Sequence, residues 1–160
     1  MSFFAAFIGL SLISPNFQEQ GFIPKEYSCV GQDTSPELRW KDAPPETKSF
    51  ALTIVDPDAP GGNFIHWVLY NVPATETSLP PNIPLEAVLP NGSMQGFNQF
   101  GKIGYGGPCP PLAETHSYIF TLYALDTMLP LPPGSSYAVL KNSMEGHILA
   151  ESKLTGRFAK

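Results

Sequence analysis

Two carboxylates and a histidine stand close together between two apolar segments of the chain. Residues 56–67 read DPDAPGGNFIHW, with Asp56 and Asp58 in a loop rich in proline and glycine, and His66 opening an apolar segment. Proline fixes its own φ angle and glycine allows turns closed to other residues, so this loop holds both acids rigidly. Acids beside an imidazole can bind a metal ion, transfer a proton or hold a charged headgroup.

A second histidine also follows a rigid segment. Residues 106–111 read GGPCPP, and His116 comes shortly after them, ahead of another apolar segment. Taken singly, each residue has an ordinary structural explanation, since an aspartate before proline often begins a turn and a histidine at a strand end is usually just hydrogen-bonded. If the two apolar segments are antiparallel neighbours, however, their ends meet. The sequence therefore predicts that Asp56, Asp58, His66 and His116 converge on one partly open pocket.

Short segments rich in β-branched and aromatic residues predict the strands that position these groups. They lie at 50–55, 67–70 and 118–125, bounded by turn-forming residues. The last is apolar almost throughout, which is typical of a strand buried on both faces. Residues 148–158 alternate between two sets of side chains and predict a terminal strand, with a longer helix as the alternative.

One helix is predicted in the C-terminal region. Ser135 or Ser136 can cap its beginning, Leu140 and Met144 lie one turn apart, and Gly146 can end it. The sequence thus predicts a mainly β architecture of antiparallel sheets with one helix late in the chain.

Composition limits the classes of partner. The chain has 160 residues, 14% of them charged, with a net charge of −5 and no cluster of lysine and arginine. These values favour one domain that lacks the basic surface needed for nucleic acid or an anionic membrane. The apolar N-terminal residues lack the basic start of a secretion signal and are too short to span a bilayer. We expect a cytoplasmic location, with a periplasmic one left open.

The chain contains two cysteines, Cys29 and Cys109. Two are too few for a disulfide framework or a zinc site. Cys109 belongs to the predicted pocket rim, so the two could be neighbours. In a reducing cytoplasm we expect them to be free thiols, with a disulfide as the alternative.

Several motifs together resemble one known family. Residues 56–60 (DPDAP), 66–71 (HWVLYN) and 106–108 (GGP), followed by His116 and Tyr118, resemble the two signature segments of the phosphatidylethanolamine-binding protein family. Further segments resemble its bacterial and archaeal branch, namely SPELRW at 35–40 and EGHILAE at 145–151. The resemblance runs from about Leu10 to Phe158, as a single domain preceded by an apolar extension at residues 1–7.

The resemblance implies a fold and a site. The fold is a large antiparallel sheet with a smaller second sheet and a helix in the C-terminal region. The site is a small anion pocket at one end of the strands, formed by Asp56, Asp58, Pro60, His66, Pro108, His116 and Tyr118. Ser117 departs from the pattern, because the family commonly has a basic residue there, and Phe64 replaces a tryptophan of eukaryotic members. The family also includes the Raf kinase inhibitor proteins, and it implies a homodimer.

We therefore expect a non-enzymatic protein that binds a small phosphorylated or carboxylated ligand, of the phosphoethanolamine type, and possesses no cofactor or metal. A carboxylate raises the pKa of a neighbouring histidine, so an imidazolium would receive the phosphate while Tyr118 donates a hydrogen bond. Asp56 or Asp58 would meet a ligand ammonium. Regulation of a protein partner such as a kinase is a further expectation. The alternative is a metal-dependent hydrolase or a peptidase-inhibitor-like regulator, since two histidines and two acids could ligate zinc or iron.

Overall fold

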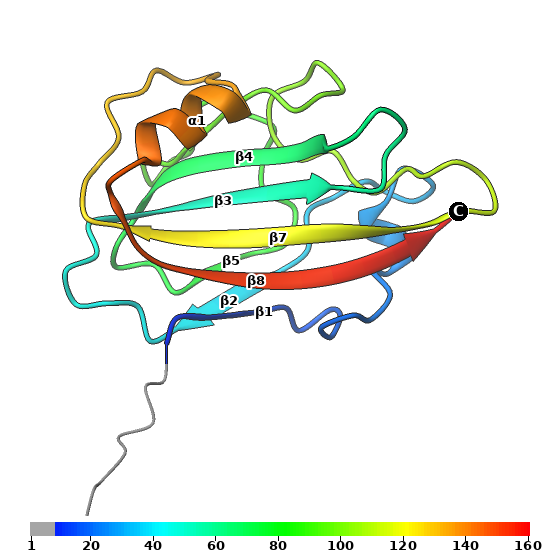
Figure 1. Ribbon diagram of the computed structural model, residues 1–160, viewed down its shortest axis with the longest axis horizontal. Coiled ribbons are helices and arrows are strands. Elements are labelled where there is room, and N and C mark those ends of the chain that lie inside the picture. The colour runs from blue at the N-terminus through cyan, green and yellow to red at the C-terminus, as the bar shows by residue number, and fades with distance from the viewer. Residues whose placement is uncertain (1–8) are drawn as a thin grey trace, which may run out of the picture.

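The computed structural model describes residues 9–160, and the predicted apolar extension at residues 1–7 lies outside them. The described chain forms two antiparallel sheets and one α-helix (Figure 1). In chain order the elements are β1 (Ser11–Ile13), the 3-10 helix η1 (Lys25–Tyr27), β2 (Leu38–Lys41), β3 (Ser49–Asp56), β4 (Phe64–Pro73), β5 (Ser78–Leu79), β6 (Met94–Gln95), β7 (Thr115–Leu125), α1 (Tyr137–Met144) and β8 (Ile148–Ala159).

The structure confirms the predicted fold class. The larger sheet has the order β6-β4-β3-β7-β8 and the smaller one the order β1-β2-β5. All four predicted strands exist as β3, β4, β7 and β8, each somewhat longer than predicted. The strand β1 lies where the apolar N-terminal segment was expected to run into a first strand, whereas the short strands β2, β5 and β6 were not predicted.

The predicted helix is also confirmed. The Ser136 side chain accepts a hydrogen bond of 3.2 Å from the backbone N–H of Val139, so it caps the first turn. Gly146 has a φ angle of +81°, a conformation that few other residues adopt readily, and the chain leaves the helix there to enter β8.

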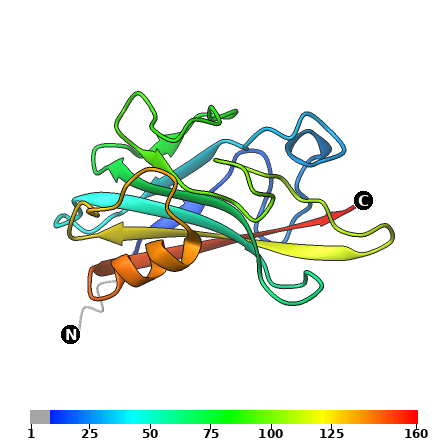
Figure 2. The same ribbon diagram turned by 90° about the horizontal axis from the view of Figure 1, so that it is seen from above.

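The larger sheet is the middle layer of the molecule. Figure 2 shows α1 on one of its faces and the smaller sheet on the other. Two apolar cores follow from this arrangement, since residues of one strand point alternately to the two faces. Phe50 and Leu52 pack toward the smaller sheet, whereas Ala51 packs with Leu140 and Met144 of α1. Among residues 9–160, no helix is long and apolar enough to cross a membrane.

Candidate ligand-binding pocket

A cavity of about 440 Å³ lies at the end of the larger sheet where β3 and β8 finish and β4 and β7 begin. Neighbouring strands are antiparallel, so these four ends meet at one edge, with Asp56 opposite Phe64 and Thr115 opposite Ala159. The residues that line the cavity come from these ends and from two loops: Asp56, Ala59, Pro60, Phe64, His66, Phe100, Cys109, Pro110, Pro111, His116 and Lys160.

Four of the seven site residues expected from the resemblance line this cavity, namely Asp56, Pro60, His66 and His116. The other three, Asp58, Pro108 and Tyr118, are not among the residues that line it. The predicted convergence of both histidines with Asp56 is therefore present in the structure, whereas Asp58 does not line the cavity.

His116 is held between two carboxylates. Its Nδ1 lies 2.7 Å from Asp56 Oδ2 and its Nε2 lies 2.8 Å from Glu114 Oε2. Ionised carboxylates only accept hydrogen bonds, so these two contacts favour the imidazolium form, in which both ring nitrogens carry a proton. Burial works to lower the pKa of His116, but the hydrogen bonds and charges of Asp56 and Glu114 outweigh it and raise the pKa above its ordinary value.

The two aspartates have different tasks. Asp56 is buried, and its Oδ1 accepts a hydrogen bond of 2.8 Å from the backbone N–H of Asp58, which fixes the start of the loop. Asp58 Oδ2 accepts a hydrogen bond of 2.8 Å from the backbone N–H of Ser117. Asp58 therefore ties the loop after β3 to β7 beside His116.

The pKa of His66 is shifted in the opposite direction from the one expected for a histidine near a carboxylate. Its Nδ1 lies 2.7 Å from the carbonyl oxygen of Gly106, to which it donates a hydrogen bond. Burial is the largest influence and lowers the pKa of His66, although this hydrogen bond and the charge of Asp56 act against it. The prediction that a nearby carboxylate raises the pKa is thus wrong for His66, because loss of solvation outweighs the carboxylate. A neutral ring that donates from Nδ1 keeps a lone pair on Nε2.

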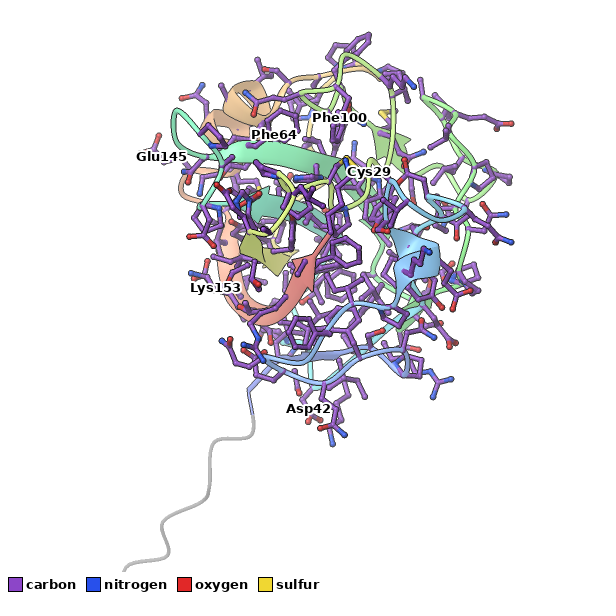
Figure 3. The ribbon with its side chains drawn as sticks, turned by 90° about the vertical axis from the view of Figure 1, so that its right-hand side faces the viewer. Cys29, Asp42, Phe64, Phe100, Glu145 and Lys153 are labelled. Atoms are coloured by element: carbon purple, nitrogen blue, oxygen red, sulfur yellow. A yellow bond between two sulfur atoms is a disulfide. The ribbon has the colours of Figure 1, made fainter. Side chains whose placement is uncertain are left out.

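An aromatic wall flanks His66. The ring of Phe64 lies 4.8 Å from that of Phe100 and 5.0 Å from that of His66, and the rings of His66 and Phe100 are 5.4 Å apart. Figure 3 shows Phe64 and Phe100 close together on the pocket side of the molecule. Three aromatic rings on one side of a cavity offer π faces to a cation or an apolar group.

Tyr118 lies behind the pocket. Its side chain is fully buried, and its ring contacts that of His66 edge-on at 5.2 Å between centroids. Its hydroxyl has no hydrogen-bond partner within residues 9–160, and burial together with the charge of Asp56 raises its pKa well above the ordinary value. The phenol is therefore a neutral donor next to the pocket.

A disulfide fixes the remaining wall. Cys29 and Cys109 are joined, with their Cα atoms 5.4 Å apart, so the prediction of neighbouring cysteines is confirmed and the prediction of free thiols is wrong. The backbone N–H of Cys29 also donates to the carbonyl oxygen of Pro108 at 3.0 Å, and Asp33 Oδ1 accepts from the N–H of Gly107 at 2.7 Å. Pro108 thus holds the pocket segment against the Cys29 loop through its backbone.

Lys160 and Glu114 were missed from the sequence. Ser117 lacks the charge that the family commonly places there, but Lys160 lines the cavity and brings a cation to it. The pairing of Thr115 with Ala159 puts Lys160 beside the start of β7. Antiparallel pairing of the two predicted strands at 118–125 and 148–158 would have revealed this neighbour.

The histidines and acids of the pocket are residue types that can also bind a metal ion. Within the part of the chain that the structure describes, no three side chains of histidine, cysteine, aspartate or glutamate are grouped to hold a metal ion. Both nitrogens of His116 are already hydrogen-bonded to carboxylates. The expectation of no stoichiometric metal stays a prediction.

Comparison with known proteins shows where similar chains occur. The family model described as phosphatidylethanolamine-binding protein matches residues 13–159. A UPF0098 protein of Methanothermobacter thermautotrophicus is 46% identical over 151 residues, covering 94% of this chain and 99% of that protein. A UPF0098 protein of Aquifex aeolicus is 42% identical and is covered to 89% of its length, with 94% of this chain aligned.

Two solved structures are similar throughout. The crystal structure of CT736 of Chlamydia trachomatis, described as a phosphatidylethanolamine-binding protein homologue, superposes with a TM-score of 0.87 at 38% identity, covering 95% of this chain and 98% of that one. YbcL of Escherichia coli, described as a member of the mammalian family, gives a TM-score of 0.85 at 34% identity, with 94% and 98% covered.

Proposed function

Because this chain belongs to the phosphatidylethanolamine-binding protein family, we propose that its pocket binds a small zwitterion of the phosphoethanolamine type and does not transform it. The ligand's oxyanion binds at His116 and Lys160, and its ammonium binds against the aromatic wall. The observation that carries this proposal is the contact between His116 and Glu114.

Glu114 already places an anionic oxygen where a ligand oxyanion would bind. Its carboxylate lies 2.8 Å from Nε2 of a charged, almost fully buried imidazolium, although the Glu114 side chain itself is 54% exposed. A phosphate oxygen can replace this carboxylate and accept the same N–H, because both are strong acceptors of charge-assisted hydrogen bonds. Asp56 on the inner side keeps the ring protonated during the exchange.

The ammonium half has a separate environment. Phe64, Phe100 and neutral His66 line the cavity together, and their rings attract a cation through their π faces. The Nε2 lone pair of His66 can in addition accept an N–H of a primary ammonium. Opposite charges of one ligand are thus matched within a single cavity.

The described residues that line the cavity support binding without turnover. The cavity wall contains no serine or threonine, and its cysteine is in a disulfide, so none of these nucleophiles faces the ligand. The hydrolase alternative would depend on His66, whose free lone pair could act as a general base. Release of inorganic phosphate from phosphoethanolamine in the presence of the protein, lost in His66→Ala, would favour that alternative.

Titration by isothermal calorimetry tests the proposal. Phosphoethanolamine should bind more tightly than inorganic phosphate, since only the former has an ammonium to place on the aromatic wall. Phe100→Leu should remove most of this difference, and Phe97→Leu, which changes an equally exposed ring outside the cavity, should leave it intact. Equal affinities for the two ligands in the wild-type protein would refute the ammonium site.

Native mass spectrometry of the untagged protein complements this titration. It would show bound ligand, bound metal and a homodimer in one spectrum. A metal ion at one equivalent would overturn the expectation that the pocket works without metal.

A further inference from the structure

A second cavity, of about 250 Å³, lies on the face of the larger sheet that carries α1. Figure 1 shows that α1 covers only part of this face, so β3, β7 and β8 remain open beyond the helix. Figure 3 places Lys153 on this side of the molecule, away from Phe100 of the first pocket and from Cys29. We call this cavity the sheet groove.

The floor of the sheet groove is a row of polar side chains across three strands. Thr53 of β3 pairs with Thr121 of β7, which pairs with Lys153 of β8, and all three line the groove. Thr53 is 1% and Thr121 is 5% exposed, and each brings a hydroxyl group to the wall of the groove. A hydroxyl group can donate one hydrogen bond, so both threonines can contribute a donor to an oxygen atom bound in the groove.

Two lysines line the groove, Lys153 in this row and Lys141 on α1. Lys141 of α1 lies with its Nζ 5.7 Å from the ring centre of Tyr123 and 5.9 Å from that of Tyr137, which holds the charge over the groove. Neither Lys141 nor Lys153 forms an ion pair with a carboxylate of the described residues. Glu151 is the single acid among the lining residues of the groove, so the local charge is positive although the whole chain has a net charge of −5.

We propose that the sheet groove is a second anion site, which binds the phosphoryl group of a small phosphate ester. Lys141 and Lys153 approach from the helix and from the edge strand, while the hydroxyls of Thr53 and Thr121 donate from below. A phosphoryl group has several acceptor oxygens and can satisfy these four donors together, which a planar carboxylate with two oxygens does less completely. The tyrosine rings form an apolar side wall for the remainder of the ester.

The loop after β3 lies between the two sites. Pro57 and Asn63 line the sheet groove, whereas Ala59 and Pro60 of the same loop line the first pocket. The two sites therefore have different walls and different donors, and each can be observed separately by its own backbone amides.

NMR titration of the ¹⁵N-labelled protein with inorganic phosphate tests the proposal. The amides of Thr53, Thr121 and Lys153 should shift as phosphate binds, independently of the amides of His66 and His116, which line the first pocket. Lys141→Gln combined with Lys153→Gln should weaken binding at the groove by roughly tenfold or more, as expected for loss of two partly exposed charge-assisted hydrogen bonds. Thr121→Val, which removes one hydroxyl and retains the shape, should weaken it by a few fold.

Lys48→Gln is the matched control, since Lys48 is exposed and lines neither cavity. It lowers the positive charge without touching the groove and should leave the groove titration unchanged. The proposal would be overturned if the groove amides still shifted in the double lysine variant. It would also be overturned if they did not shift in the wild-type protein at about 10 mM phosphate, a concentration at which a site of millimolar affinity is mostly occupied. Neither result bears on the first pocket, whose ligand binding is measured separately by the shifts of its own amides and by calorimetric titration.

Discussion

The contact between Glu114 and His116 predicts that the protein competes with its own ligand for the first pocket. In Glu114→Gln the amide oxygen can still accept the hydrogen bond from His116 Nε2, so the geometry of β7 is retained while the negative charge disappears. An incoming oxyanion then displaces a neutral group instead of a carboxylate. We therefore expect Glu114→Gln to bind phosphoethanolamine more tightly than the wild-type protein.

The size of this gain follows from the exposure of the two groups. Two unit charges about 4 Å apart interact by about 4 kcal/mol at an effective dielectric constant of 20 and by about 1 kcal/mol in bulk water. Glu114 is more than half exposed and His116 is buried, so the interaction falls toward the lower end of this interval. Removal of the competing charge should yield about 1–2 kcal/mol, which is a gain in affinity of roughly five- to thirtyfold.

Calorimetry with inorganic phosphate and with phosphoethanolamine measures this gain. Glu46→Gln is the control, since it makes the same change in net charge at an exposed turn before β3, at the other end of that strand from the pocket. An affinity for phosphoethanolamine that is unchanged or lower in Glu114→Gln would refute the reasoning, because Glu114 would then help binding or play no part in it.

Three further predictions follow from charges and contacts in the structure. The ligand affinity and the stabilising contribution of His116 should both be at their maximum below the ordinary histidine pKa. Both should fall as the pH rises through the raised pKa of His116. Ligand titrations and denaturant unfolding at a series of pH values would show this fall. Alkylation without reductant should modify neither cysteine, and Cys29→Ser should lower the free energy of unfolding by about 2–4 kcal/mol, measured in denaturant, because the disulfide closes a long loop. Ser136→Ala should cost about 1 kcal/mol by removing the cap on Val139, and an unchanged denaturation midpoint would contradict that role.

The long elements could be predicted because their patterns extend over many residues. The continuous apolar character of β7 and the alternation along β8 correspond to the observed burial of these strands. The strands β5 and β6 contain only two residues each, which is too short for any hydrophobic period. Their existence depends on pairing with distant strands.

The sequence allowed the position of the site to be predicted, but it did not reveal the direction in which the pKa of each histidine is shifted. Asp56, His66 and His116 could be expected to meet because they stand at the ends of antiparallel strands. The lowered pKa of His66 depends on how deeply its ring is buried, and the sequence shows only that a carboxylate is near. Glu114 follows directly after a tight turn at Ala113, whose φ angle of +67° is unusual for a residue with a side chain.

Strand β3 has a consequence for how the protein reaches its fold. It is buried along nearly its whole length and pairs with β4 on one edge and with β7 on the other. During synthesis β4 follows β3 at once, whereas β7 emerges about sixty residues later, so one edge of an apolar strand stays unpaired in the nascent chain. Such an edge is a template for pairing with other chains, and contacts between distant residues form slowly. Aggregation during refolding should therefore increase with protein concentration, and the sensitive segment should be β3.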